Sequence, residues 1–169
     1  HNRAFAKRML HIVFANCEQI RGVRRSVTRP VLLSLVVALV LTRLDYGNAL
    51  LVGLPQQQLA KLQSVLHAAL RLIYGVRRHD HITPLLRELH WLPIARRIEF
   101  KLAVLVFKCL HGMAPPYLSG ALQRSADVES RQRLRSSSSA ELTVPRTELK
   151  TVGDLAFPIA APRVWNILP

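Results

Sequence analysis

Hydrophobic residues recur at intervals of three and four over most of the first 122 residues, which is the spacing of one buried helix face. One such stripe consists of Leu59, Leu62, Leu66, Ala69 and Ile73, and another of Ile94, Ile98, Leu102, Leu105 and Cys109. Pro55 and Pro93 precede the stripes, and proline suits the first turn of a helix. Gly75 and Gly112 follow them, and glycine commonly ends a helix. The pattern therefore predicts two long amphipathic helices between these residues.

Three further helices are expected upstream and between these two. The first 20 residues have helical periodicity, with Phe5, Met9, Ile12 and Val13 toward the apolar side. A second helix is expected from Pro30 to about Leu44, and a short one from Thr83 to about residue 89. The apolar run 31–41 is shorter than the roughly 20 residues that a bilayer crossing needs. We therefore interpret it as a helix buried in a protein core.

The pattern changes at about residue 123. Four consecutive serines occupy positions 136–139, beside Arg131, Arg133 and Arg135, and helical periodicity is absent there. Such a composition is typical of a linker. Residues 141–145 are expected to form a short strand or extended arm, and the apolar residues from 153 onward are expected to fold back on the helices. We predict a mainly α fold: a helical bundle-like body (1–122), a Ser/Arg-rich irregular segment (123–150) and a short C-terminal apolar return (151–169).

The charge balance narrows the choice of partners. The chain has 24 Lys and Arg against 10 Asp and Glu, a formal net charge of +14. A polyanionic partner relieves the repulsion among so many cations. Most of them are Arg, whose planar fork binds phosphate oxygens in pairs and stacks on bases. The balance favours a nucleic-acid partner, and an acidic protein partner remains the alternative.

Three groups of basic residues are candidates for contacts with a phosphate backbone, which needs positive charge but no special spacing. On the predicted helix after Pro93, cations at spacings of four and seven share one face. The candidates are Arg24, Arg25, Arg77, Arg78, Arg96, Arg97, Lys101 and Lys108. The alternative is an ordinary solvated helix face. It weakens for the set as a whole, because few acidic residues accompany these cations.

The acidic residues do not form a catalytic pattern. Two-metal polymerases and nucleases need several carboxylates at one place, whereas Asp45, Asp80, Asp127 and Asp154 are each isolated in sequence. Glycine-rich phosphate loops and a nucleophile elbow are absent from the sequence. We nominate no catalytic residue, no metal ligand and no cofactor for this chain.

Residues 79–81, His-Asp-His, are the one segment with metal-ligand chemistry. Alternate residues of an extended segment point to opposite sides, and further ligands are not close in sequence. We therefore expect Asp80 to accept backbone hydrogen bonds in a structural turn.

Cys17 and Cys109 are far apart in apolar helical contexts, so we expect two buried free thiols in an intracellular protein of the nucleus or cytoplasm. Tyr74 and Trp91 are expected to be packing aromatics rather than platforms for bases.

Short motifs also follow one another in a characteristic order along nearly the whole chain. They are Val40-Leu-Thr-Arg43-Leu-Asp45-Tyr46-Gly-Asn48-Ala-Leu-Leu, Gly53-Leu-Pro55, Leu62-Gln63, Ala68-Ala69-Leu-Arg71-Leu, Asp80-His81-Ile82-Thr83-Pro84-Leu-Leu, Leu89-His90-Trp91-Leu92-Pro93, Arg97-Ile98, Lys108-Cys-Leu-His111-Gly112, Ala114-Pro115-Pro116-Tyr117-Leu118, Leu134-Arg135-Ser136-Ser137, Val144-Pro145-Arg146, Gly153-Asp154, Ala156-Phe157 and Ala160-Ala161-Pro162-Arg163-Val-Trp165-Asn166-Ile-Leu-Pro169. In this order they resemble the region downstream of the palm in LINE-type (non-LTR) retrotransposon reverse transcriptases.

The resemblance implies a part in RNA-directed DNA synthesis. The family's metal-binding aromatic-x-Asp-Asp motif has no counterpart here, so its catalytic residues and the Mg²⁺ expected for the full polymerase belong to another part of the enzyme. Gly47 stands where the family usually has Cys. The matched region would be the thumb-side and post-thumb helices. Its expected partners are template and primer RNA and DNA and the missing palm and fingers, with no membrane.

Two hypotheses thus remain at the level of sequence. In the first, the chain is a truncated, non-catalytic fragment of a reverse transcriptase that binds nucleic acid without sequence specificity. In the second, it is a domesticated or decayed helical module that acts through protein contacts or has no function. Nucleic-acid binding is the property that separates them.

Overall fold

The computed structural model describes residues 2–46, 51–127, 141–146 and 156–168. They form a mainly α fold, as predicted, in two compact units. Unit 1 comprises residues 1–98 and unit 2 residues 99–169. The division falls inside one helix, α6 (Ile94–Leu110), and not at residue 122, where the sequence pattern changes. The start of this helix packs in the core of unit 1, whereas Leu102, Val106 and Cys109 from its remainder are buried in unit 2.

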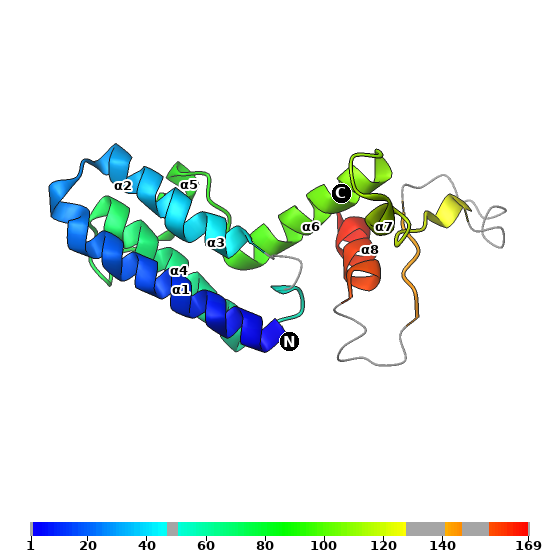
Figure 1. The fold of residues 1–169 in the computed structure, drawn as a ribbon, viewed down its shortest axis with the longest axis horizontal. Coiled ribbons are helices and arrows are strands. Elements are labelled where there is room, and N and C mark those ends of the chain that lie inside the picture. The colour runs from blue at the N-terminus through cyan, green and yellow to red at the C-terminus, as the bar shows by residue number, and fades with distance from the viewer. Residues whose placement is uncertain (1, 47–50, 128–140, 147–155, 169) are drawn as a thin grey trace. The chain divides into compact units, whose positions relative to one another are not determined.

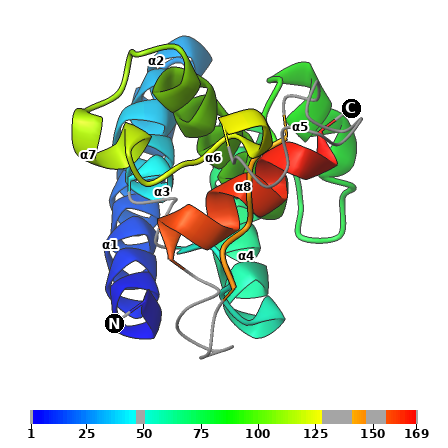
Figure 2. The same ribbon diagram turned by 90° about the vertical axis from the view of Figure 1, so that its right-hand side faces the viewer.

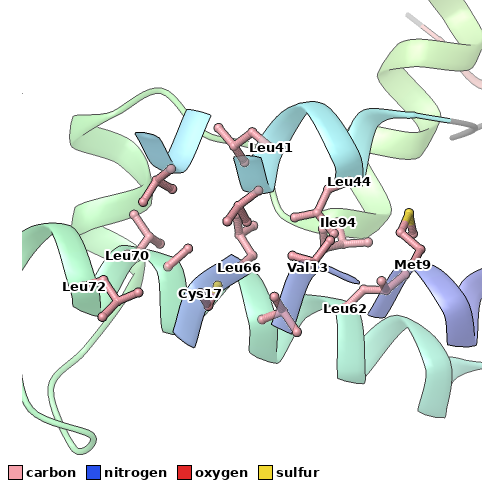
Figure 3. Close-up of a cluster of buried hydrophobic side chains, with 14 of the residues drawn as sticks. Met9, Val13, Cys17, Leu41, Leu44, Leu62, Leu66, Leu70, Leu72 and Ile94 are labelled. Atoms are coloured by element: carbon pink, nitrogen blue, oxygen red, sulfur yellow. The ribbon is translucent and has the colours of Figure 1, made fainter. Parts of the chain in front are cut away.

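Unit 1 is built on two long helices and a third segment of consecutive helical turns (Figure 1). Its elements are α1 (Asn2–Val23), the 3-10 turn η1 (Arg24–Ser26), α2 (Arg29–Val36), the π-helical segment η2 (Val37–Leu41), α3 (Thr42–Asp45), α4 (Gln56–Tyr74) and the short α5 (Thr83–Glu88). Figure 3 shows Val13 and Cys17 of α1 between leucines of α4 and of the η2–α3 segment. This continuous apolar core holds α1 and α4 together, and the ends of these helices carry Arg21 and Arg71.

Helix α4 confirms the predicted apolar stripe and its end. Leu62, Leu66, Ala69 and Ile73 are buried, and Leu59, the first residue of the predicted stripe, is half-buried against the core. Gly75 caps the helix in the left-handed conformation, with φ +72°, and its N–H donates to the Arg71 carbonyl at 2.9 Å. A residue with a Cβ would be strained in this conformation, which explains why glycine stands here.

The apolar run 31–41 forms a helix, as expected, but its second half is π-helical. The N–H of Thr42 bonds to the carbonyl of Val37, five residues back. The side chain of Asn16 in α1 donates to the carbonyl of Leu39 at 2.7 Å, inside the same segment. The wider turn thus gives a backbone acceptor to a neighbouring helix. Among the described residues, no helix is both long and apolar enough to cross a membrane.

The beginning of α6 is attached to unit 1 by polar contacts. The Ile94 N–H donates to the side-chain oxygen of Gln63 in α4 at 2.8 Å, so α4 provides a cap for α6. Arg97 forms a two-pronged ion pair with Asp45 at the end of α3: Nη2 lies 3.3 Å from Oδ2, and Nε bonds to Oδ1. The two side chains are only 15% and 24% exposed.

Unit 2 contains the rest of α6, α7 (Pro116–Ser119), the 3-10 turn η4 (Ser125–Asp127) and α8 (Phe157–Ile167). Figure 2 shows segment 141–146 passing beside α8. The backbone of Leu142 is held by Asn166, which accepts from the Leu142 N–H and donates to its carbonyl, both at 2.9 Å. A single antiparallel bridge joins Leu142 to Arg124. The C-terminal apolar residues therefore form a helix that holds the extended arm.

Among its described residues, unit 2 has a small apolar core. The buried apolar side chains there are Leu102, Val106, Cys109, Leu142, Ile159, Ala160, Ala161 and Pro162. Val106 takes the buried position that the sequence pattern gave to Leu105, which is half-buried. The serines at 136–139 and the arginines at 131, 133 and 135 lie outside the described residues.

Candidate nucleic-acid interface

Four arginines of unit 1 surround one hollow of about 310 Å³. Arg21 and Arg24 come from the end of α1 and from η1, Arg71 from the last turns of α4, and Arg78 from the segment after it. Apolar side chains form the rest of the described lining, namely Ala68, Leu72 and Val76. We call this site the arginine hollow. Two of the eight predicted residues, Arg24 and Arg78, meet here.

The glycine that ends α4 also makes room for one of these arginines. A Cβ built on Gly75 would lie 2.5 Å from Nη2 of Arg24, which is closer than real Cβ contacts allow. The guanidinium of Arg24 therefore lies directly against the backbone at the end of α4. Gly75 thus serves both the helix cap and the shape of the hollow.

Arg71 is the most enclosed of the four arginines. Its Nη2 donates to the carbonyl of Arg78 at 3.1 Å, which positions the chain after α4. Its Nε is buried and has no hydrogen-bond partner among the described residues. A buried donor without an acceptor is costly. The guanidinium thus retains hydrogen-bonding capacity that the described part of the protein does not use.

Carboxylates are scarce around the hollow. Arg21 pairs with Glu18 at 3.0 Å, an exposed pair within α1. None of the described residues that line the hollow is acidic. The four guanidinium groups that line the hollow therefore leave a local excess of positive charge. Such a concave cationic surface attracts phosphate groups.

The cationic surface continues along the same two helices. Lys7, His11 and Phe14 of α1, with Lys61 and Ser64 of α4, border a shallow hollow near the beginnings of both helices. Since α1 and α4 also meet at the arginine hollow near their ends, they run in the same direction. Fourteen helical residues separate Lys7 from Arg21, a rise of about 21 Å. None of these residues is among the eight sequence candidates, although their helical spacing is visible in the sequence.

The segment after α4 forms the predicted turn. The N–H of Arg77 donates to Oδ2 of Asp80 at 2.5 Å, and the N–H of Asp80 donates to the Arg77 carbonyl. The prediction that Asp80 accepts a backbone hydrogen bond is confirmed. His79 and His81 are exposed, and the described residues contain no cluster of three side chains suited to a metal ion.

The other predicted contact residues are dispersed. Arg25 and Arg77 are exposed near the arginine hollow but are not among its lining residues. Arg96 belongs to unit 1, whereas Lys101 and Lys108 belong to unit 2, and all three are exposed. Of the six candidates in unit 1, only Arg24 and Arg78 line the arginine hollow.

Arg97 is the residue whose surroundings differ most from the expectation of a solvent-facing cation. Its guanidinium is bound by Asp45 and largely buried. In the folded chain, the first turn of α6 lies beside the end of α3. The side of α6 that carries Arg97 therefore faces α3 rather than solvent. Asp45, which is isolated in sequence, is brought to Arg97 by the fold.

Two aromatic residues and one histidine near α4 have structural partners. The guanidinium of Arg29 lies 4.3 Å from the ring centre of Tyr74 and also pairs with Glu88 at 3.2 Å. Trp91 is half-buried against the core, so both aromatics pack as expected.

Burial, and secondarily the cation of Arg71, lower the pKa of His67. The Gln63 amide nitrogen lies 2.7 Å from Nε2 of His67, and since it can only donate, that ring nitrogen accepts.

The fold and the arginine hollow define a mainly α protein with a concave cationic surface in unit 1. No known protein family, curated protein or solved structure matches this chain.

Proposed function

We propose that this chain binds the phosphate backbone of RNA or DNA and is itself non-catalytic, as the helical region downstream of the palm in a LINE-type reverse transcriptase. The single observation that carries the binding proposal is the arginine hollow, in which four guanidinium groups from α1, η1, α4 and the segment after α4 surround one concavity. The ordered sequence motifs support the link to reverse transcriptases.

The physical basis is electrostatic. An arginine fork binds two phosphate oxygens at once, and each neutralised phosphate releases counterions. Cationic side chains of α1 that border the two hollows extend from Lys7 to Arg21, a rise of about 21 Å. One strand of a duplex carries a phosphate about every 3.4 Å along the axis, so about six phosphates match this length. Contacts of this kind hold a strand in place without reading its bases.

The test measures the affinity of labelled RNA and DNA oligonucleotides by fluorescence anisotropy at increasing salt. The wild-type chain should bind at low salt and lose affinity steeply as salt rises. Replacing Arg24 and Arg78 by Gln should weaken binding about tenfold or more and reduce the salt slope for duplex DNA by about two.

The matched control replaces Lys101 and Lys108 of unit 2 by Gln, with the same loss of charge. This variant should change affinity much less than the arginine variant. A larger loss in the control would place the interface on α6, and undetectable binding at low salt would contradict the proposal altogether.

A second candidate function is a protein-contact module. It is favoured by the exposed apolar side chains of unit 2, which include Phe100, Phe107, Met113 and Tyr117. Exposed apolar groups of this size mark contact surfaces when they cluster. In this case sedimentation should reveal association through unit 2, and the arginine variant should bind oligonucleotides as the wild type does.

A further inference from the structure

A separate pocket lies where the first half of α1 meets the end of α3. It has a volume of about 270 Å³. Phe5, Met9 and Ile12 provide apolar lining from one side of α1, and Arg43 and Tyr46 line it from α3 and the residue after it. Arg8 completes the described lining. We call this site the aromatic pocket. It shares no described lining residue with the arginine hollow.

The two aromatic rings offer a stacking surface. Their centres are 6.4 Å apart, and their planes are tilted by 39°. Phe5 is half-buried, whereas Tyr46 is 72% exposed. A largely exposed aromatic ring at the edge of an apolar hollow presents a face on which another planar group can stack.

Tyr46 is held in place by the backbone around it. Its N–H donates to the carbonyls of Thr42 and Arg43, at 3.0 and 3.2 Å, as α3 ends. The preceding residue, Asp45, forms the ion pair with Arg97. The π-helical segment before α3 is tied to α1 through Asn16. These contacts connect the segment that carries Tyr46 to α1 and to the start of α6.

The charges of the pocket indicate the chemistry of its ligand. The described lining contains two arginines and no carboxylate. Within the described residues, no acidic side chain pairs with Arg8 or Arg43. An apolar protein side chain would leave both cations unused. A ligand with a flat apolar body and an attached anion uses the rings and the arginines together.

The size of the pocket restricts this ligand further. Pockets for drug-sized molecules begin at about 300 Å³, so a hollow of about 270 Å³ suits one small ring system. Single-stranded nucleic acid presents such groups, since each unpaired base has a stackable face and a phosphate nearby.

We propose that the aromatic pocket binds one unpaired nucleobase of single-stranded RNA or DNA. The base stacks on Tyr46, and the adjoining phosphate lies at Arg8 or Arg43. The biological ligand follows from the proposed function of the chain, but the pocket can be tested separately with a mononucleotide.

The first experiment records amide chemical shifts of the whole chain during titration with adenosine 5′-monophosphate or with ribose 5-phosphate, which lacks the base. The mononucleotide should shift the signals of Tyr46 and Arg43, and ribose 5-phosphate should have a much weaker effect. Equal effects of the two ligands would show phosphate binding alone and would overturn the proposed base site.

The second experiment compares a single-stranded oligonucleotide with an abasic strand of the same length and charge. The wild type should prefer the strand with bases about fivefold or more, since stacking of a base on an aromatic residue has an effect of this size. Tyr46→Ala should remove this preference, and Tyr46→Phe should retain it. Tyr117→Ala is the matched control, because Tyr117 is a 76% exposed tyrosine in unit 2.

The outcomes separate the two proposals. If both strands bind equally to the wild type, backbone binding stands and the base site is overturned. If Tyr46-dependent binding of the mononucleotide occurs but no oligonucleotide binds, the base site stands and the proposed function falls. If Tyr46→Ala alters only self-association in sedimentation, the pocket is a protein contact and the inference is overturned. Circular dichroism of each variant confirms that the helices are intact.

Discussion

Unit 1 and unit 2 are both helical and have cores of different extent. Unit 1 buries one continuous cluster from α1, the α2–α3 segment, α4 and the first turn of α6. Unit 2 buries a few residues of α6 and α8 and relies on Asn166 to hold the backbone of Leu142. A large core can support a rim of like charges, whose mutual repulsion is destabilising. The arginine hollow accordingly lies on the unit with the larger core.

Each unit also contains one buried cysteine, which allows the two to be compared directly. Cys17 lies in unit 1 and Cys109 in unit 2. Burial raises the pKa of both thiols, to about 11 for Cys17. Because the thiolate is the reactive form, neither should be alkylated at neutral pH until its unit opens. The rates of labelling at the two cysteines therefore report the opening of the two units.

The largest expected effect comes from removing a core side chain. Leu66→Ala in unit 1 should cost about 3 kcal/mol, because Leu66 is fully buried in the cluster. Labelling of Cys17 should accelerate strongly while that of Cys109 stays unchanged. Val106→Ala is the reciprocal control in unit 2 and should accelerate Cys109 alone. Joint acceleration of both cysteines in either variant would show that the two units open together.

Replacement of Arg97 by Gln should destabilise unit 1 by about 1–2 kcal/mol, since Asp45 loses the partner of a largely buried ion pair. Urea unfolding of the variant and of Asp45→Asn measures this cost. Oligonucleotide affinity should change less than twofold in the folded protein. A loss comparable to that of the arginine-hollow variant would instead make Arg97 a direct phosphate contact.

Two glycines with the same conformation provide a matched pair across the units. Gly75 and Gly112 have φ of +72° and +70°. Alanine at either position should cost about 1 kcal/mol, because the left-handed conformation is strained for residues with a Cβ. Only Gly75→Ala displaces Arg24, so only this variant should also weaken oligonucleotide binding. Equal oligonucleotide affinities of the two variants would show that Arg24 does not belong to the interface.

The smallest effect is expected from pH. The pKa of His67 is lowered in the folded protein, so the unfolded chain binds the proton more readily. The stability of unit 1 should therefore be complete above the ordinary histidine pKa of about 6.5 and decrease as pH falls below it. Cys17 labelling from pH 7.5 to 5.5, corrected for thiolate reactivity, measures this. His67→Gln should reduce the dependence, and His81→Gln, at an exposed position, should not.

Local features of the fold were accessible from the sequence because neighbouring residues determine them. The period of three and four predicts α4 and its buried face, and Gly75 marks its end because the cap requires a left-handed backbone. Asp80 was recognisable as a turn residue for the same reason. The π-helical segment was not predictable, since Asn16, 23 residues away in sequence, bonds to its backbone.

The candidate interface was predictable only in part. The excess of arginine favoured a polyanionic ligand, and two of the eight candidate residues, Arg24 and Arg78, line the arginine hollow. Arg21 and Arg71 were missed because each lies on a helix whose own sequence suggests only an ordinary charged surface. Arg97 was expected on a solvent-facing surface, whereas it forms a largely buried ion pair with Asp45. That pair could not be foreseen, because Asp45 lies 52 residues away in sequence.

Charge and periodicity are properties of composition and short spacing, so a helical, strongly basic chain without a recognisable catalytic motif could be inferred from the residues alone. Which cations share a concave surface, and that Arg97 is paired with Asp45, became evident only from the folded chain. Those outcomes depend on which helix ends meet, and this is set by the packing of residues far apart in the chain.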